Sequence, residues 1–468
     1  MTHENSFDNL ATPIPYISIK PAPTFANTPY NGRQRIDASL IRFSKNDSKF
    51  GLATDLVSMR GEKVLNERIQ TLDFRDIVIN DEEFEIQNFI DGFISAPVFL
   101  SKDNRWTLKD FDNNEIALSA LDAHFGASAS INYFFNEFRR NSVDNKGMVL
   151  LNAVSPIVVN NEDELQSGHN AFWASSFDYD GTTYGMMAYF DGVDRGSGSI
   201  GDVGLVAGLD VLAHEVTHGV TEYTAGLIYQ AESGALSEGI SDIFGVNIKA
   251  SVMGVDKNKI PEWSWRIGEP NFIMRDMSNP NNYDQPDTYK GLYWYDTAPD
   301  PITGYTLNGN DNGGVHINSG VLNYWYALAV EGSGNSGLGK ESPNLLIGAH
   351  ENYTNDNGYV YRVKGIGMDK MQGVVYRALA KYLEPESDFI DARSSTIKAA
   401  KDLTRLSIAK LYPGVPRLRS RDVNTIRSAW DAVGVGGGLA EKEPSSYSIG
   451  QQIDTLQGVA NNIGDLLG

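Results

Sequence analysis

Two histidines and a glutamate, His214, Glu215 and His218, form the His-Glu-x-x-His pattern that most constrains how this chain can fold. Residues four apart lie on one face of an α-helix, so both imidazoles can bind one metal ion if this segment is helical. The glutamate then lies beside that metal, where a base that activates water is needed. The alternative is an accidental pair on a solvated helix, which the presence of only seven histidines in 468 residues disfavours. We therefore predict a metal-binding helix at about residues 205–222.

A third ligand is expected from Glu238, which follows His218 by twenty residues within a second predicted helix. Two histidines and one glutamate leave the fourth position of a zinc ion open to water, which is typical of catalytic sites. Asp242 lies one helical turn beyond Glu238 and could accept the second ring N–H of a ligating histidine. A lone glutamate on a helix is usually just solvated, so this interpretation depends on the pattern around it.

Several segments together resemble the thermolysin-like metalloproteases, or gluzincins. Residues 214–245, HEVTHGVTEYTAGLIYQAESGALSEGISDIFG, are similar to the zinc-helix region of that family. Further similar segments follow in the family's order: LDAH at 121–124, NAFW at 170–173, MRDMS at 274–278, DNGGVHINSG at 311–320, GVVYRALAKYL at 373–383 and AWDAVGV at 429–435. The resemblance covers about residues 47–436 and implies a zinc-dependent endopeptidase that acts on proteins or peptides.

The resemblance also implies roles for individual residues. Glu215 would be the general base that takes a proton from the attacking water. Tyr229 and His316 would donate hydrogen bonds to the oxyanion of the tetrahedral intermediate, and Asp311 would orient His316. Arg275 would bind a substrate carbonyl. Without the surrounding motifs, Tyr229 would be read as a buried aromatic residue and His316 as a core histidine.

Five more positions are implied to bind substrate. Asn170 and the backbone of Ala171 match positions that hold the substrate strand. Leu205, Val211 and Met274 fall where the family forms the pocket for the residue after the cleaved bond. All three are apolar, so we expect cleavage before bulky hydrophobic residues, although the same three could be ordinary core residues.

The chain departs from the family at its calcium sites. Asp210 and Glu269 match calcium ligands of relatives, but Lys249 and Arg266 stand where carboxylates are expected. A hard cation needs several oxygen ligands, and two bases would repel it. Calcium binding is therefore doubtful, and salt bridges could replace the ions. Ser237 is a second departure, because relatives have an amide there to support the equivalent of His218.

Composition limits the partners. The formal charge is −21, from 60 acids against 39 bases, which disfavours nucleic acid and anionic lipid. The chain has no cysteine, so metal ligands must be histidines and carboxylates. No apolar run reaches the roughly 18 residues that span a bilayer. We expect a soluble protein; the resemblance suggests a secreted or exported bacterial one, but no ordinary signal peptide is visible.

We predict four regions along the chain. Residues 1–46 form an N-terminal extension, either a short pro-segment of a zymogen or a surface arm or disordered tail. Residues 47–228 form a β-rich catalytic domain that ends in the zinc helix, and 229–436 a helical catalytic domain. Residues 437–468 form a glycine-rich linker and a short amphipathic tail. The tail could pack on its own chain or dock on another protein, and its acidic residues argue against a membrane anchor.

The expected fold class is α+β, with a sheet-rich N-terminal half, a mainly helical C-terminal half and the zinc helix at the cleft between them. Short apolar alternations within 47–120 predict an antiparallel sheet. Further strands are expected at 147–160 and 184–191. His124 is expected to pack inside a helix at 119–140 rather than bind metal. Other helices are predicted at 231–250, 314–332, 367–384, 389–404 and 421–433.

Two points stay open. Residues 290–310 form an aromatic-rich insertion that could rim or cover the cleft, and so narrow the choice of substrate. The competing function is a non-catalytic binding or structural protein that retains the fold. Chelator-sensitive hydrolysis of casein would separate these two functions.

Overall fold

The computed structural model describes most of the chain between residues 96 and 436 and a series of strands before it. The described residues are 18–21, 24–28, 31–36, 39–42, 48–51, 53–60, 63–74, 78–80, 96, 98–111, 119–159, 171–179, 181–190, 208–256, 260–269, 273–296, 311–334 and 353–436. Their contacts define two compact units. The sheet unit comprises the described residues of 1–128 and 147–207, and the helical unit those of 129–146 and from 208 onward.

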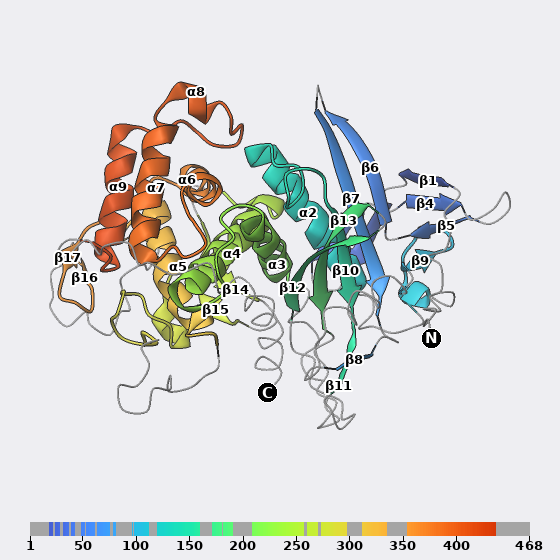
Figure 1. The fold of residues 1–468 in the computed structure, drawn as a ribbon, viewed down its shortest axis with the longest axis horizontal. Helices are drawn as coiled ribbons and strands as arrows, with labels where there is room; N and C mark the ends of the chain where they lie inside the picture. The colour runs from blue at the N-terminus through green and yellow to red at the C-terminus, as the bar shows by residue number, and fades with distance from the viewer. Residues whose placement is uncertain are drawn as a thin grey trace, which may run out of the picture. The chain divides into compact units, whose positions relative to one another are not determined.

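The sheet unit is built on a five-stranded sheet whose strands lie side by side in the order β12-β13-β10-β7-β6 (Figure 1). The strands are β6 (Ala53–Arg60), β7 (Lys63–Asp73), β10 (Val149–Val154), β12 (Ala171–Tyr179) and β13 (Thr182–Tyr189). β10 runs parallel to both of its neighbours, whereas β6–β7 and β12–β13 are antiparallel. All six residues of β10 are buried, as expected for a strand inside a mixed sheet with both faces covered.

Smaller sheets complete this unit. An antiparallel sheet has the order β1-β4-β5-β9, formed by β1 (Ser18–Pro21), β4 (Ser39–Arg42), β5 (Ser48–Gly51) and β9 (Leu100–Ser101). β2 (Thr24–Thr28) and β3 (Gly32–Ile36) form a hairpin. β8 (Val78–Asn80) pairs in parallel with β11 (Ile157–Val159), and a 3₁₀ turn, η1, covers Leu108–Phe111. Within the range 47–120 the predicted antiparallel pairing is right for β5, β6 and β9, whereas β7 also pairs in parallel with β10 and β8 pairs in parallel with β11.

His124 packs inside the sheet unit, as predicted. It lies on α2 (Ala120–Phe138), a helix that contributes residues to both units, and its side chain is fully buried. Its Nδ1 lies 2.8 Å from Thr71 Oγ1, which accepts a 3.0 Å hydrogen bond from Asn152 Nδ2. A ring nitrogen of His124 is therefore engaged by a buried hydroxyl, as buried polar groups generally are.

The helical unit contains the remaining helices. They are α3 (Leu209–Glu222), α4 (Ala231–Val252), α5 (Val315–Glu331), α6 (Met368–Lys381), α7 (Phe389–Leu403), α8 (Leu406–Ala409) and α9 (Ser420–Ala432). Short elements join them: η3 (Glu262–Trp265), β14 (Arg266–Ile267), β15 (Arg275–Asp276), η4 (Pro280–Tyr283), β16 (Tyr353–Thr354) and β17 (Val360–Tyr361). Sheets in the N-terminal half and helices in the C-terminal half confirm the predicted α+β class.

Helix α4 is the centre of the helical unit. Every residue from Gly234 to Ala250 is buried, and α3, α5, α6 and α7 all pack against it. Small residues allow these close approaches. A Cβ on Gly245 would lie 2.7 Å from the backbone oxygen of Asp210 on α3, and one on Gly239 would lie 2.9 Å from Leu322 on α5. Glycine at these positions therefore sets how near the helices that hold the site can come.

Helices α5 and α7 both pack against α9. Trp325 of α5 stacks on Trp430 of α9, with ring centres 4.6 Å apart. The Trp430 indole N–H donates a 2.8 Å hydrogen bond to Thr396 Oγ1 on α7, so the buried ring leaves no unpaired donor. At its N-terminus α7 has a capping box, in which Asp388 and Asp391 each accept a backbone N–H of the other.

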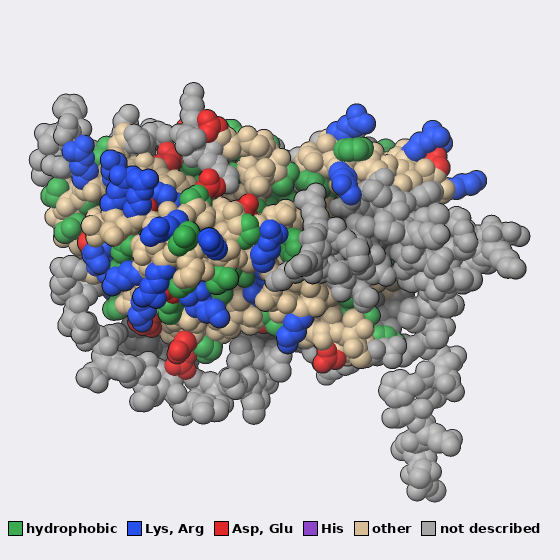
Figure 2. All heavy atoms as spheres, turned by 90° about the horizontal axis from the view of Figure 1, so that it is seen from above, with side chains coloured by type: hydrophobic (Ala, Val, Ile, Leu, Met, Phe, Trp, Pro, Cys, Tyr) green, Lys and Arg blue, Asp and Glu red, His purple; other side chains and the backbone are tan. Residues whose placement is uncertain are grey.

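Charge is unevenly distributed over the surface. Residues 389–432 contain nine Lys or Arg against four Asp, although the whole chain carries −21. Figure 2 views the molecule from the side on which Figure 1 places α8, and Lys and Arg side chains gather there. Among the described residues no helix is long and apolar enough to span a membrane. The predicted domain boundaries stay predictions, and the predicted tail at 437–468 lies outside the described residues.

Candidate metal centre and active site

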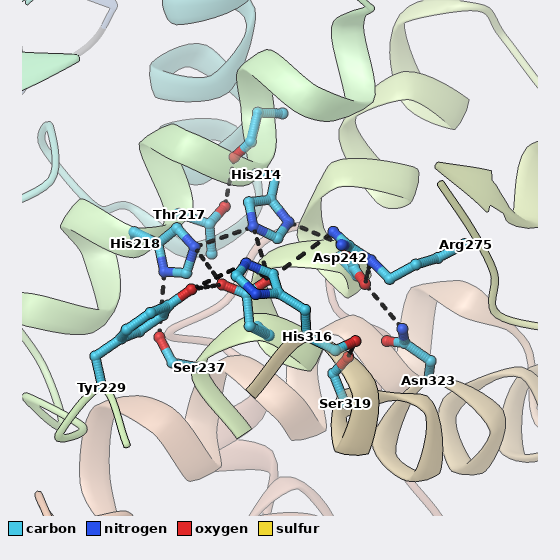
Figure 3. Close-up of polar contacts among 12 residues, drawn as sticks. His214, Thr217, His218, Tyr229, Ser237, Asp242, Arg275, His316, Ser319 and Asn323 are labelled. Atoms are coloured by element: carbon cyan, nitrogen blue, oxygen red, sulfur yellow. Dashed lines mark hydrogen bonds and ion pairs between the residues drawn. The ribbon is translucent and has the colours of Figure 1, made fainter. Parts of the chain in front are cut away.

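The three predicted ligands converge within the helical unit. His214 and His218 project from successive turns of α3, and Glu238 approaches from α4; their ligand atoms all lie within 4.8 Å of one another. The two Nε2 atoms are 3.0 Å apart. Glu238 places Oε1 3.1 Å from His218 Nε2 and Oε2 3.4 Å from His214 Nε2. Two imidazole nitrogens and a carboxylate therefore face one point (Figure 3).

This arrangement fits a divalent metal ion. Two Nε2 atoms at 3.0 Å cannot both present lone pairs to each other without a proton or a cation between them. Glu238 is 1 % exposed, and its Oε2 has no hydrogen-bond partner among the described residues. A buried carboxylate oxygen in this state calls for a partner such as a metal ion. Nitrogen and oxygen donors in this combination suit zinc.

Asp242 supports the centre from one turn further along α4. It is fully buried and accepts a 2.9 Å contact from His214 Nδ1, so that His214 Nε2 is left to face the metal position. Arg275 donates to the same carboxylate from Nε at 2.8 Å and from Nη2 at 2.7 Å, and Asn323 Nδ2 donates at 2.8 Å. Burial opposes the charge, but Arg275 and His214 hold the pKa of Asp242 down at about 2. This carboxylate therefore stays ionised and links a metal ligand to a cation.

The charges around His214 alter its own titration. Burial by itself would lower the pKa of this imidazole, but Glu238 and Asp242 outweigh that effect and raise the pKa to about 10.

His218 has a weaker supporting partner than His214, because its Nδ1 lies 3.2 Å from the hydroxyl of Ser237 rather than beside a carboxylate. The departure noted in the sequence therefore leaves a neutral hydroxyl rather than an amide beside His218.

Tyr229 and His316 reach the same centre from other segments. The Tyr229 hydroxyl donates a 2.6 Å hydrogen bond to Glu238 Oε1 and lies 3.1 Å from His316 Nε2. His316 Nδ1 contacts Asp311 Oδ1, and its backbone N–H donates to Asp311 Oδ2 at 3.2 Å. Burial works against the charge of His316, but Glu238 and Asp311 raise its pKa above the usual value. Two polar hydrogen donors thus lie beside the ligand carboxylate.

An unusual turn presents His316. Asp311, Asn312, Gly313 and Gly314 all have positive φ, at 71°, 45°, 82° and 80°. Left-handed backbone in non-glycine residues costs free energy and is found mainly where surrounding structure enforces it, often at functional sites. A Cβ on Gly314 would also lie 2.7 Å from Tyr295 Cβ. The glycine therefore permits both the turn and the approach of Tyr295.

The aromatic-rich insertion lies against this turn where it is described. Tyr295 N–H donates to Asn318 Oδ1 and Asn318 Nδ2 donates to Tyr295 O, both at 2.9 Å. Further back, Leu292 N–H donates to Asp356 at 2.7 Å. Residues 290–296 are thereby held beside Asp311 and α5. Residues 297–310 of the predicted insertion lie outside the described residues.

Three of the remaining predicted site residues lie in the helical unit, and one lies in the sheet unit. Glu215 is buried on α3 between the two histidines, and Val211 is buried one turn before it. Met274 is half-buried, with its N–H bound to Ile267 O at 3.0 Å. Ala171 begins β12 in the sheet unit. The predicted positions Asn170 and Leu205 lie outside the described residues.

The two bases at the expected calcium positions form ion pairs. Lys249 Nζ lies 2.8 Å from Asp210 Oδ2, and both side chains are buried. Lys249 also donates to Glu269 O at 3.2 Å, and Asp210 Oδ2 accepts from Gly268 N–H at 3.0 Å. Arg266 contacts Glu262 and lies 3.8 Å from Glu269. The ammonium group of Lys249 therefore occupies the neighbourhood of Asp210 that a cation would need.

Sequence reasoning missed Asn323. It is fully buried on α5, and its amide reaches Asp242 on α4. A signal was present in the sequence, because Asn323 is the only amide in the otherwise apolar and aromatic run VLNYWYALAV at 321–330. A polar residue buried in such a run needs a hydrogen-bond partner.

Comparisons with known proteins agree with this geometry. A family model described as the thermolysin metallopeptidase catalytic domain matches residues 44–222, and its counterpart for the alpha-helical domain matches residues 225–435. The chain belongs to the thermolysin metallopeptidase family. The two matched ranges contain every predicted site residue, with the metal ligands divided between them.

Individual relatives of the family are similar over most of this chain. Thermostable neutral protease NprT of Geobacillus stearothermophilus is 34% identical over 340 residues, which are 70% of this chain and 48% of that protein. Thermolysin of Bacillus sp. (strain EA1) is 34% identical over 336 residues, 70% of this chain and 47% of that protein. The chain thus spans about half the length of these relatives. A solved precursor of protealysin from Serratia proteamaculans is 21% identical, with a TM-score of 0.44 over 81% of this chain and 90% of that one.

Proposed function

We propose that this member of the thermolysin family is a zinc-dependent endopeptidase. The observation that supports the proposal most strongly is the convergence of His214, His218 and Glu238 within 4.8 Å, with Tyr229 and His316 beside the same carboxylate. Three protein ligands leave a position for water, which distinguishes a catalytic zinc site from a structural one. A bound zinc ion would acidify that water and polarise the substrate carbonyl.

Glu215 is the proposed general base. It lies between the two histidines on α3 and is buried, so the helix that carries two of the ligands also carries the proposed base. As water attacks the peptide carbonyl carbon, Glu215 accepts the proton that the water loses. It can then transfer this proton to the leaving amine as the C–N bond breaks, which balances the reaction.

The other residues stabilise charge. The tetrahedral intermediate carries a negative oxygen, and Tyr229 O–H and His316 Nε2–H are the proposed donors to it. Arg275 uses Nε and Nη2 on Asp242, and its Nη1 has no hydrogen-bond partner among the described residues. We propose that this free group donates to a substrate carbonyl. Because Asp242 holds Arg275 by two bonds, the guanidinium loses little freedom on binding substrate.

The preference for bulky hydrophobic residues after the cleaved bond belongs to the same proposal. It is supported by the apolar character of Val211 and Met274, together with Leu205 in the sequence. Cleavage of a peptide library followed by sequencing of the products measures it. A proteome-derived library with no enrichment of Leu, Ile, Phe or Val at that position would contradict this part of the proposal. A pro-segment role for residues 1–46 and export from a bacterial cell stay predictions.

Glu215→Gln tests the proposed mechanism. We expect casein and peptide hydrolysis to fall by a factor of about a hundred or more while one zinc ion per chain is retained, because the change removes a proton acceptor and no ligand. His218→Ala should lose both zinc and activity. Zinc content is measured by elemental mass spectrometry, and hydrolysis is assayed with and without chelator. Full activity in Glu215→Gln, or hydrolysis that persists after zinc removal, would refute the proposal.

A further inference from the structure

We propose that Asn323 is a positioning residue that fixes Asp242 and thereby holds both the metal ligand His214 and the substrate-binding Arg275. The inference rests on the proposed zinc endopeptidase function and extends it to a residue outside the ligand and acid–base set. Figure 3 shows Asn323 on the side of Asp242 away from His214.

The contacts of Asp242 show why a fourth donor matters. Its Oδ1 meets His214 Nδ1 at 2.9 Å and Arg275 Nη2 at 2.7 Å, while Oδ2 meets Arg275 Nε at 2.8 Å and Asn323 Nδ2 at 2.8 Å. The first three donors lie on residues that must themselves be held in place. Asn323 lies in the middle of α5, where every residue from Asn318 to Val330 is buried, and is itself fully buried. It is therefore the donor that ties the carboxylate to a fixed element.

The orientation of the Asn323 amide supports a functional role. A carboxylate accepts hydrogen bonds, so the amide must turn its NH₂ group toward Asp242. Its Oδ1 is then buried without a hydrogen-bond partner among the described residues. A buried unpaired acceptor destabilises the folded protein. An apolar residue of similar shape would avoid that loss, so stability alone does not account for an asparagine here.

The position of Asn323 also joins the elements of the site. It is seven residues after His316 on α5, and Asp242 is four residues after Glu238 on α4. Residues at these intervals lie on the same face of a helix. The single Asn323–Asp242 hydrogen bond therefore connects the face of α5 that begins with His316 to the face of α4 that supplies the metal ligand.

Asn323→Leu is the test, because leucine keeps the shape of asparagine and removes both polar atoms. We expect zinc affinity, measured by competition with a chromophoric chelator, to fall about tenfold, the lower end of the usual effect of partners that support a metal ligand. Because Arg275 shares Asp242, we also expect KM for a short peptide to rise about threefold or more, which is near the lower end of the net contribution of one hydrogen bond. Asn323→Ala is the second variant, which keeps the test available if leucine prevents folding.

Tyr326→Phe is the matched control. Tyr326 lies three residues further along α5, is fully buried and donates a 2.9 Å hydrogen bond to Asn247 on α4, so it joins the same two helices without touching the site. We expect it to lower thermal stability and leave zinc affinity and KM unchanged. Zinc affinity within twofold of the unmodified protein in folded Asn323→Leu or Asn323→Ala, or an equal loss in Tyr326→Phe, would overturn the inference. Failure of the unmodified protein to bind zinc or cleave peptide would instead contradict the proposed function.

Discussion

Replacement of Lys249 by methionine should destabilise the protein substantially, although Lys249 is neither a proposed metal ligand nor a proposed catalytic residue. Its ammonium group lies 2.8 Å from Asp210, and the two side chains are 7% and 0% exposed. Removing one partner of a buried pair leaves the other charge unneutralised, at a cost of about 3–5 kcal/mol. Asp210 would keep two backbone donors, Gly268 N–H and Val211 N–H, each at 3.0 Å. We therefore expect the lower end, about 3 kcal/mol.

The assay is thermal unfolding followed by circular dichroism. For domains of 150–250 residues, 1 kcal/mol shifts the melting temperature by about 2–4 °C, so Lys249→Met should lower it by about 6–12 °C. Lys398→Met is the control, because Lys398 is exposed on α7. The double variant Lys249→Met with Asp210→Asn should recover part of the loss, since it removes the unpaired charge. A shift below about 2 °C for Lys249→Met would refute the reasoning.

The same ion pair predicts how the protein responds to calcium. Because a lysine ammonium already neutralises Asp210, a calcium ion at that position would meet a positive charge instead of a second carboxylate. We expect the melting temperature to change little when a calcium-selective chelator is added with zinc kept saturated. A fall of tens of degrees would show that calcium binds elsewhere in the chain and stabilises it.

Two further predictions concern α5 and the loop before it. Burial raises the pKa of Asp287 from 3.8 to about 6, so the folded state favours the protonated carboxyl and loses stability as pH rises from about 4 to 6. Asp287→Asn should remove that loss, which is at most about 3 kcal/mol; equal melting-temperature differences from the unmodified protein at pH 4 and pH 8 would contradict this. Gly314→Ala should reduce peptide turnover about tenfold with zinc retained, because its φ of 80° and the 2.7 Å approach of Tyr295 force the Asp311 turn to move. Unchanged turnover would show that His316 does not depend on this turn.

The helices could be predicted because their apolar residues recur at helical intervals. The expected ranges 231–250, 314–332 and 389–404 agree with α4, α5 and α7 to within one or two residues. The strands were harder to predict, because the spacing of apolar residues within a strand does not show which other strand pairs with it. β12 was not predicted as a strand, and it contains a bulge between Trp173 and Ser175. The parallel pairing of β8 with β11 joins segments that lie about eighty residues apart in the chain.

Within the site, local spacing predicts less than the family pattern does. The interval between His214 and His218 predicts a shared face on one helix, but no interval predicts that Glu238 will meet them from another. Asn323 and Tyr295 show most clearly which contacts the sequence does not predict. Their roles come from close approach of α5 to α4 and of the insertion to the Asp311 turn, which depend on small residues such as Gly239 and Gly314. Such contacts arise only when the helices are packed.

The pairs between α3 and α4 show how the chain sets the geometry of its metal ligands. Asp210 meets Lys249, His214 meets Asp242, and His218 meets Glu238, so residues later on α3 meet residues earlier on α4. The two helices therefore run antiparallel and are joined at three successive turns. Gly245 lets them approach between the first two pairs. Asp210 lies one turn before His214, so the buried Lys249 pair fixes the same register that determines the distance between the histidines and Glu238. A mutation at Lys249 should consequently weaken metal binding as well as stability, and the loss in zinc affinity should be smaller than that of Asn323→Leu, because Asp242 would keep its hydrogen bonds from Asn323 and Arg275 and stay fixed beside His214.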